Sequence, residues 1–189
     1  MRIIAGQHRG KALVSVGAGD AAAHLRPTTD RVRENIFNML QGGRYGNPIS
    51  GARVLDLFAG TGALGLEALS RGASHVCFVD NGAKAGALIR ENIKLLGAGQ
   101  DTTYQRGSAL KLGPCPQDPF DLIFLDPPYD QGMGNIALQS AVNGGWVAAD
   151  ALIVMEDGSA MLPPPGMRQL DQRRYGNTHI MILRPEDTE

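Results

Sequence analysis

The sequence Asp126-Pro127-Pro128-Tyr129, called the DPPY motif below, is the strongest chemical signal in this chain and directly follows the apolar run 122–125. The run predicts a buried strand, and the prolines must turn the backbone out of the sheet because proline continues neither a strand ladder nor a helix. The Asp126 carboxylate and the Pro127 carbonyl are two hydrogen-bond acceptors, and the Tyr129 ring can stack on a planar group. The motif, with Pro128 as a further contact, therefore predicts a site for the exocyclic amino group of a base.

A second motif spans residues 56–65, where Gly60, Gly62 and Gly65 have the spacing G-x-G-x-x-G, and Asp80 follows Gly60 by twenty residues. The spacing fits a dinucleotide-binding fold in which Asp80 contacts a ribose hydroxyl. A carboxylate at Asp56 would repel a pyrophosphate at a helix N-terminus, but it suits a cationic ammonium group. We therefore expect S-adenosylmethionine as the cofactor. The residues predicted to hold it are Asp56, Phe58, Ala59, Gly60, Gly62, Asp80, Asn81, Ser108 and Ala109, with the last two beside the adenine ring.

The elements that must position these motifs alternate along the chain. Strands are predicted at 53–58, 75–80, 103–106, 121–125 and 151–155, helices at 63–71, 83–96 and 134–143, and an antiparallel hairpin from 167–174 and 177–183. Alternating strands and helices predict a parallel sheet that is covered on both faces. In a doubly wound order the strand before the DPPY motif lies next to the first strand, so both motifs open at one carboxyl edge. An amino nitrogen would then lie close to a sulfonium methyl group, as an in-line displacement requires.

Residues 1–50 form a predicted leader to a catalytic domain at 51–189. Short strand-like runs at 2–5 and 11–16 predict a β-hairpin, and a helix is expected to begin near Asp30. Residues 1–33 carry a net charge of +4, whereas the whole chain has a net charge of −1. A basic segment beside a catalytic domain is typical of an arm that contacts phosphates. The predicted contacts to nucleic acid are Arg9, Lys11, Arg26, Arg31 and Arg33.

Composition agrees with one globular unit of 189 residues, 43% of them hydrophobic and 20% charged. A chain of this size buries enough surface for a core without a metal or a disulfide. Its two cysteines lack the spacing of a zinc or redox site, which predicts free thiols in a reducing cytoplasm. The sequence has neither a signal-peptide pattern nor an apolar stretch long enough to span a membrane.

Together these residues resemble the RsmD family, bacterial methyltransferases of guanine N2 in 16S ribosomal RNA. The similar segments are 2–6 with Arg9-Gly10, 25–34, 56–73, 120–129 and 174–176. The resemblance implies a Rossmann-like class I methyltransferase fold, in which a seven-stranded, mostly parallel sheet ends in an antiparallel pair. It also implies S-adenosylmethionine, no metal, and a monomer that acts on the small ribosomal subunit or its assembly intermediate.

Residue roles carry over from this resemblance. Asp56, Gly60, Gly62 and Asp80 would hold the cofactor, and the DPPY motif would take the target base. Ser108 departs from the acid that related methyltransferases often have beside adenine. For the arginines of residues 25–34, RNA phosphates and the cofactor carboxylate both fit as partners.

Three other functions remain compatible with parts of this pattern. A DNA amino-methyltransferase of adenine N6 or cytosine N4 shares the DPPY motif, but such enzymes usually carry extra mass that reads DNA sequence. A non-catalytic module that binds S-adenosylmethionine or RNA is a further alternative. The presence of both an intact DPPY motif and intact glycine spacing disfavours it, because loss of either would be expected in such a module. A nicotinamide oxidoreductase fits the glycine spacing, but Asp56 and the absence of a hydride-transfer site disfavour it.

Overall fold

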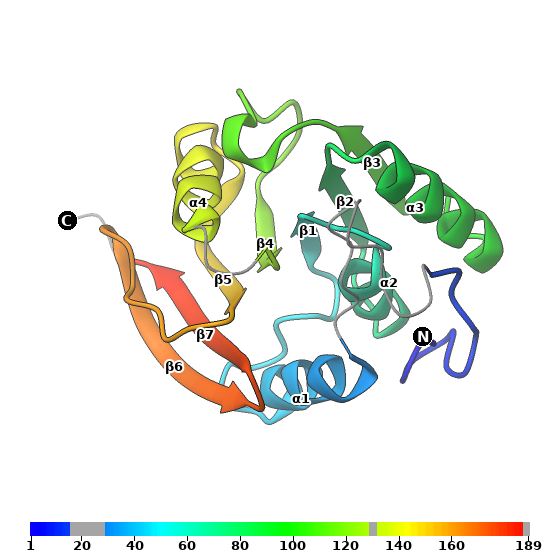
Figure 1. Cartoon of the computed structure of the whole chain (residues 1–189), viewed down its shortest axis with the longest axis horizontal. Helices are drawn as coiled ribbons and strands as arrows, with labels where there is room; N and C mark the ends of the chain where they lie inside the picture. The colour runs from blue at the N-terminus through cyan, green and yellow to red at the C-terminus, as the bar shows by residue number, and fades with distance from the viewer. Residues whose placement is uncertain (16–28, 129–131, 187–189) are drawn as a thin grey trace.

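The protein is an α/β molecule built on one twisted sheet of seven strands (Figure 1). The computed structural model describes residues 1–15, 29–128 and 132–186. In chain order the elements are α1 (Asp30–Gln41), β1 (Arg53–Leu57), α2 (Ala63–Ser70), β2 (His75–Asp80), α3 (Ala83–Leu96), β3 (Thr102–Arg106), the short 3₁₀ helix η2 (Ala109–Lys111), β4 (Phe120–Leu125), α4 (Met133–Asn143), β5 (Val147–Asp157), β6 (Met167–Tyr175) and β7 (Thr178–Pro185). No helix in the described ranges is long and apolar enough to cross a membrane.

The strand order is β3-β2-β1-β4-β5-β7-β6. The first five strands of this order are parallel, and β7 runs antiparallel to both β5 and β6. This arrangement confirms the predicted parallel sheet with its antiparallel terminal pair. The chain moves outward from β1 to β3 and then crosses back to β4, so β1 and β4 are neighbours at the point where the order reverses.

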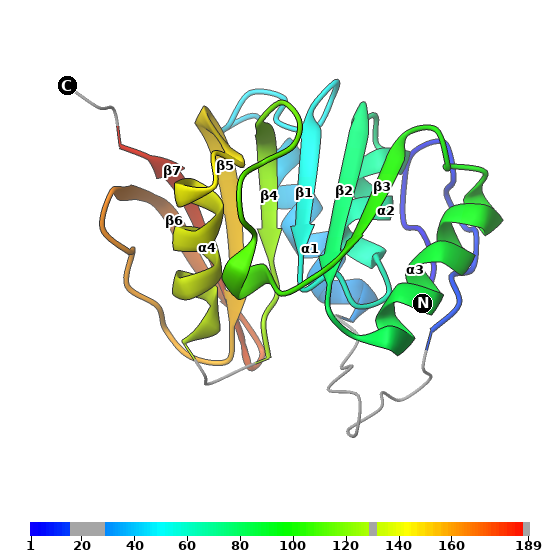
Figure 2. The same ribbon diagram turned by 90° about the horizontal axis from the view of Figure 1, so that it is seen from above.

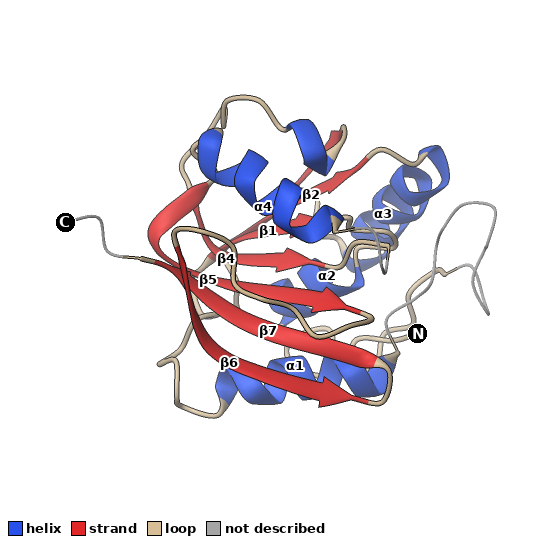
Figure 3. Cartoon of the chain, turned by 60° about the vertical axis from the view of Figure 1, so that its left-hand side comes forward, coloured by secondary structure: helices blue, strands red, loops and turns tan. Residues whose placement is uncertain are grey.

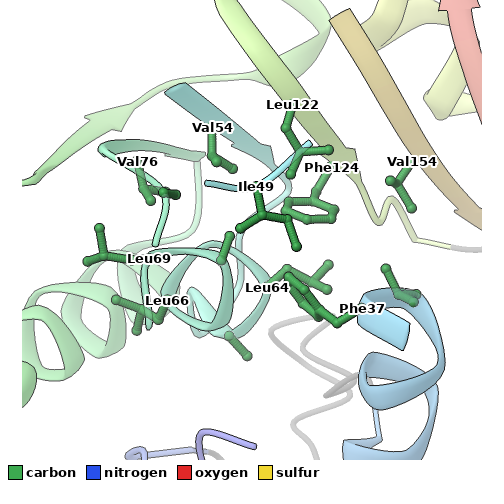
Figure 4. Packing of buried hydrophobic residues seen from close by; sticks show 14 of the residues in the cluster. Phe37, Ile49, Val54, Leu64, Leu66, Leu69, Val76, Leu122, Phe124 and Val154 are labelled. Atoms are coloured by element: carbon green, nitrogen blue, oxygen red, sulfur yellow. The ribbon is translucent and has the colours of Figure 1, made fainter. Parts of the chain in front are cut away.

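Helices cover both faces of the sheet (Figure 3). On one face, α1, α2 and α3 pack over side chains such as Val54 and Phe124 (Figure 4). The other face holds α4 and η2 over Ile123, Leu125 and their neighbours. Strands buried on both sides must be apolar almost throughout, which explains why their sequences are continuous hydrophobic runs rather than alternating ones.

The leader shares the core of the main domain. Ile3, Leu13 and Phe37 are buried in the same hydrophobic cluster as the first face of the sheet, and the Phe37 ring lies 5.7 Å from the Phe124 ring. The division into a leader of 1–50 and a domain of 51–189 therefore describes sequence segments that fold around a common core.

The predicted N-terminal hairpin is present but short: around the antiparallel bridge between Arg2 and Ala12, the N–H groups of Ile3 and Leu13 donate to the carbonyls of Lys11 and Met1, at 2.9 and 3.1 Å. The reason is that α2 takes backbone groups that a longer ladder would use. The N–H groups of Ile4 and Ala5 donate to the Glu67 carboxylate, at 2.8 and 3.0 Å. The N–H of His8 donates to the Ser70 hydroxyl at 3.0 Å. The first three residues of the chain are thus paired with residues 10–13, and the residues that follow them are attached to α2.

Replacing Gly65 by alanine is expected to destabilise the fold by about 1–3 kcal/mol, the usual cost of overpacking a core. A Cβ atom at this position would lie 2.5 Å from Cε1 of Phe78 and 2.7 Å from Cγ1 of Val76, both buried in β2. Urea unfolding measures the effect, with Gly99→Ala as the control because a Cβ at Gly99 meets nothing within 4 Å. Equal midpoints for the two variants would show that α2 can move away from β2 at little cost.

Candidate active site

Both chemical motifs lie at the carboxyl edge of the sheet, toward which the parallel strands point in Figure 2. Leu57 at the end of β1 is in register with Leu125 at the end of β4. The N–H of Asp126 donates to the carbonyl of Leu57 at 3.5 Å. The DPPY motif therefore starts beside the loop that joins β1 to α2, called the glycine loop below (residues 58–62).

The glycine loop has a backbone conformation that few sequences can adopt. Phe58 has a φ of 61° and Gly60 and Gly62 have φ values of 57° and 77°. A positive φ costs little for glycine but strains a phenylalanine, and such strain is commonly found at functional sites. The N–H of Ala59 donates to the Val79 carbonyl at 3.2 Å, which fixes the loop against β2.

Asp56 supports this loop instead of facing the edge. Its side chain is 1% exposed, and its Oδ2 accepts the N–H of Gly65 at 2.9 Å. Gly62, the N-cap of α2, has no side chain to bind the first free N–H groups of the helix, so the Asp56 carboxylate fills that role. Burial raises the pKa of Asp56 well above its usual range; the Gly65 hydrogen bond opposes this shift, and the charges of Asp126 and Asp80 add to it. The structure thus gives Asp56 a supporting role at the start of α2, and its expected contact with an ammonium group stays a proposal.

Asp80 connects two loops at the edge. Its Oδ2 accepts the N–H of Gly60 at 2.9 Å, and its Oδ1 accepts the N–H of Gly82 at 2.8 Å. The side chain is half-buried, and each carboxylate oxygen has a second lone pair that can accept a ribose hydroxyl. Asn81 follows it and is exposed. The two residues remain candidate cofactor contacts.

Ser108 and Ala109 lie after β3, close to the loop that follows β2. The N–H of Gly107 donates to the Asp80 carbonyl at 3.1 Å, and the Ser108 hydroxyl accepts the N–H of Leu110 as the N-cap of η2. Ser108 is half-buried and Ala109 is 4% exposed. As N-cap, the Ser108 oxygen uses one acceptor position, and its hydroxyl proton is free to donate to an adenine nitrogen.

The described part of the DPPY motif comprises Asp126 and Pro128, which are half-buried, and Pro127, which is buried. Tyr129 lies outside the described residues. One acidic side chain near this motif was missed by the sequence analysis: Glu156 of β5, which is 1% exposed. Within the described part of the chain its carboxylate oxygens have no hydrogen-bond partner. An acid at the end of the apolar run 151–155 was the signal that could have identified it. Within the described ranges no group of His, Cys, Asp and Glu side chains could hold a metal ion.

The basic residues predicted to contact nucleic acid are not gathered in one place. Arg9 and Lys11 are exposed on the leader, whose residue Gln7 binds Ser70 at the C-terminal end of α2. That end of α2 is the one away from the glycine loop. Arg31 is exposed in the first turn of α1, and Arg26 lies outside the described residues.

Arg33 is a structural residue. Its side chain is fully buried and forms ion pairs with Asp30 at 2.9 Å and with Glu67 at 3.8 Å. It also donates to the carbonyl of Arg2. The predicted contact of Arg33 with RNA is therefore corrected, because its guanidinium is enclosed between the leader and α2.

Asn92 ties the leader to the glycine loop. Its side-chain amide donates to the carbonyls of Val14 and Thr61, both at 3.0 Å. Its Oδ1 accepts the N–H of Val14 at 2.7 Å. The leader thus runs along α2 and reaches the carboxyl edge where the glycine loop lies.

Two further arginines lie near the edge that carries the DPPY motif. Strand β6 runs parallel to β5 in space, because both are antiparallel to β7. Its last residues therefore lie at the same edge as the carboxyl ends of β4 and β5. Arg173 and Arg174 are exposed there, and the sequence analysis assigned them no role. By contrast, a surface cavity of about 750 Å³ between η2, α4 and Pro164-Pro165 includes none of the predicted site residues.

Residues 1–184 match the family model described as "Conserved hypothetical protein 95". The chain belongs to this family. The match confirms the resemblance to the RsmD family. The chain is 38% identical over 157 residues to "Ribosomal RNA small subunit methyltransferase D" of Escherichia coli strain K12, covering 82% of this chain and 74% of that protein. It is 37% identical over 190 residues to "Putative rRNA methyltransferase YlbH" of Bacillus subtilis strain 168, covering 97% of this chain and 98% of that protein.

The fold of the family is that of class I methyltransferases. The solved structure of "Putative methyltransferase yhhF from Escherichia coli" superposes with a TM-score of 0.81 and 30% identity, covering 98% of both chains. The Rossmann-like fold expected from the resemblance is thus confirmed. In this fold the glycine loop and the DPPY motif lie together at the carboxyl edge of the sheet.

Proposed function

We propose that this protein transfers a methyl group from S-adenosylmethionine to the exocyclic N2 amino group of a guanine in 16S ribosomal RNA. One observation carries the proposal: the DPPY motif and the glycine loop follow neighbouring parallel strands and meet at one edge of the sheet. The names of the two relatives support a ribosomal RNA substrate, and that of the E. coli protein supports the small subunit. S-adenosylmethionine is the methyl donor that this fold and these relatives imply.

The edge of the sheet offers what the donor needs. The glycine loop lets the backbone approach a ligand closely, Asp80 can accept ribose hydroxyls, and Ser108 can donate to adenine. Once bound, S-adenosylmethionine would supply an electrophilic methyl group on a sulfonium, whose carbon–sulfur bond breaks as the carbon–nitrogen bond forms and leaves a neutral thioether.

The DPPY motif prepares the acceptor nitrogen. The lone pair of an aromatic amine is delocalised into its ring, so the amine is a weak nucleophile. Hydrogen bonds from its two N–H groups to the Asp126 carboxylate and the Pro127 carbonyl would favour a pyramidal nitrogen whose lone pair faces the methyl group. Each hydrogen bond to a charged group contributes about 1.5–3 kcal/mol. After transfer the nitrogen releases one proton, which the Asp126 carboxylate can accept. Tyr129 is proposed to stack on the base.

The RNA surface would combine basic groups near the carboxyl edge with basic groups on the leader. Arg31, Arg173 and Arg174 are exposed, and Arg9, Lys11 and Arg26 are proposed as phosphate contacts of the leader. If a folded ribonucleoprotein already exposes the target base, the enzyme needs little additional surface to recognise the sequence around that base. The base must still leave its stack, which costs a few kcal/mol. We further propose that the protein acts as a monomer in the cytoplasm on the small subunit or its assembly intermediate.

The experiment is methyl transfer from radiolabelled S-adenosylmethionine to small ribosomal subunits from a strain that lacks this protein. We expect label in 16S RNA, and digestion to nucleosides should yield N2-methylguanosine. Label on duplex DNA but not on ribosomal RNA would contradict the RNA assignment. Tight cofactor binding without transfer to any nucleic acid would favour a non-catalytic module.

A further inference from the structure

Glu156 has no explanation in the mechanism above. It ends the buried part of β5, is 1% exposed, and neither of its carboxylate oxygens has a hydrogen-bond partner among the residues that the structure describes. The other buried acids are bonded: Asp56 accepts the N–H of Gly65, and Glu67 accepts those of Ile4 and Ala5. A carboxylate removed from water without a partner is costly, so its retention at this position calls for a role.

The strand register brings Glu156 beside Asp126. Leu125, the last residue of β4, pairs with Met155 of β5, so Asp126 and Glu156 directly follow this last pair. Side chains alternate along a strand, and Glu156 follows Val154 by two positions. Val154 lies on the face of the sheet that α1 and α2 cover, as Figure 4 shows. The Glu156 side chain therefore lies on the same face as Val154, one pleat closer to the carboxyl edge of the sheet.

The charged groups that face Glu156 are acids. Burial raises the pKa of Glu156 well above its usual range, and the charges of Asp126 and Asp56 raise it further. Its register partner on β7 is the buried residue Ile180. From the helices, α1 and α2 place apolar side chains such as Phe37 and Leu64 on this face. The guanidinium of Arg33 on α1 is already engaged with Asp30 and Glu67.

A carboxyl group in these surroundings binds a proton more readily than an exposed one, and in its protonated form it offers one O–H donor. The nearest acidic group along the sheet is Asp126, which must stay ionised to accept an N–H of the target amino group. A hydrogen bond to the charged form of a carboxylate stabilises that form, and two adjacent carboxyl groups commonly share one proton.

We propose that Glu156 is a positioning residue whose protonated carboxyl group donates a hydrogen bond to the Asp126 carboxylate and so keeps Asp126 ionised and oriented toward the target amino group. The inference deepens the proposed function and rests on it. Glu156 touches neither base nor cofactor in this role; it acts through Asp126.

Two variants separate this role from simple packing. In Glu156→Gln the side chain keeps a neutral donor of almost the same shape, whereas Glu156→Leu keeps only the volume. We expect kcat at neutral pH to stay close to the wild-type value in Glu156→Gln. In Glu156→Leu it should fall about 10- to 100-fold, the loss of one charge-assisted hydrogen bond. KM for S-adenosylmethionine should change little in either, and Asp157→Asn is the matched control on the same strand. Wild-type kcat in Glu156→Leu would overturn the proposal.

The pH profile adds a test that packing alone would not affect. When Glu156 ionises as the pH rises, the wild-type enzyme loses the donor and its kcat should fall. Glu156→Gln cannot ionise, so this decrease should be absent from its profile. The same decrease in both proteins would overturn the role of Glu156.

A thermal unfolding series tests the shared proton without any assay of activity. The folded state binds the Glu156 proton more tightly than the unfolded chain does. As the pH rises above the ordinary pKa of a glutamate, this residue therefore lowers the free energy of unfolding. The Tm difference between Glu156→Gln and the wild type should therefore increase in favour of the variant from pH 5 to pH 8. The same comparison in an Asp126→Asn background should show a smaller increase. A gain that is independent of pH, or of Asp126, would overturn the coupling. If the coupling is present but no RNA is methylated, the proposed function fails and the Asp126–Glu156 pair stands.

Discussion

Asp126→Ala is expected to reduce kcat for methyl transfer to ribosomal RNA by about 10²–10⁴-fold, the range for a group that acts directly on the reacting atom. The variant removes the carboxylate that would accept an N–H of the target amine and later its proton. Cofactor binding should be largely kept, because the described contacts of the glycine loop include Asp80, Val79 and Asn92 but not the Asp126 side chain. Single-turnover transfer and calorimetric binding of S-adenosylmethionine measure the two quantities separately.

Two further variants make the result specific to the carboxylate. Asp126→Asn keeps one carbonyl acceptor and should lose less activity than Asp126→Ala. Asp150→Ala removes an exposed acid from the amino-terminal half of β5 and should behave as wild type. A rate for Asp126→Ala within a few-fold of wild type would remove this residue from the mechanism. Equal loss of transfer and cofactor binding would assign it to the cofactor instead.

Glu67→Ala is expected to destabilise the protein by about 3–5 kcal/mol, the cost of breaking a buried ion pair by removing one partner. Glu67 is fully buried and bonds Arg71 at 2.7 Å, in addition to the N–H groups of Ile4 and Ala5. Its loss leaves the buried Arg33 without one of its two carboxylates and removes the acceptor for two leader amides. Urea unfolding measures the change in free energy, and Glu91→Ala on the exposed face of α3 is the control.

The same variant separates the leader from the rest of the fold. Hydrogen exchange at the amides of Ile4 and Ala5 should accelerate more than at β1 or β4 if Glu67 attaches the leader specifically. If the leader positions RNA, transfer should fall more than cofactor affinity under conditions where Glu67→Ala remains folded. Uniform acceleration of exchange across the sheet would instead indicate that Glu67 acts only on global stability.

The fold followed from the sequence to a large extent because its signals are local. The apolar run before Asp126 has the length and composition of a buried strand. Gly97 ends α3 in the left-handed conformation that glycine adopts at helix ends, with a φ of 66°. The alternation of strands and helices then permits few topologies, and the rule that parallel strands meet ligands at their carboxyl edge indicated the site.

The roles of individual polar residues were less predictable, because they depend on which neighbours the fold brings close. Asp56 has the sequence position of a ligand contact but lies under α2, where it binds the N–H of Gly65. Arg33 belongs to a basic segment but is buried against Glu67, far away in the sequence. The spacing of residues within each motif does not predict these buried contacts.

The sequence by itself determined the chemistry of the edge: an acid, two prolines and a ring after one strand, and a glycine loop after another. Strand and turn preferences act over a few residues, so these features are visible without a structure. Only the tertiary structure decided which acids support the site and which face it, because burial depends on packing between distant segments. It also revealed Glu156, whose significance comes from lying beside Asp126 across two paired strands.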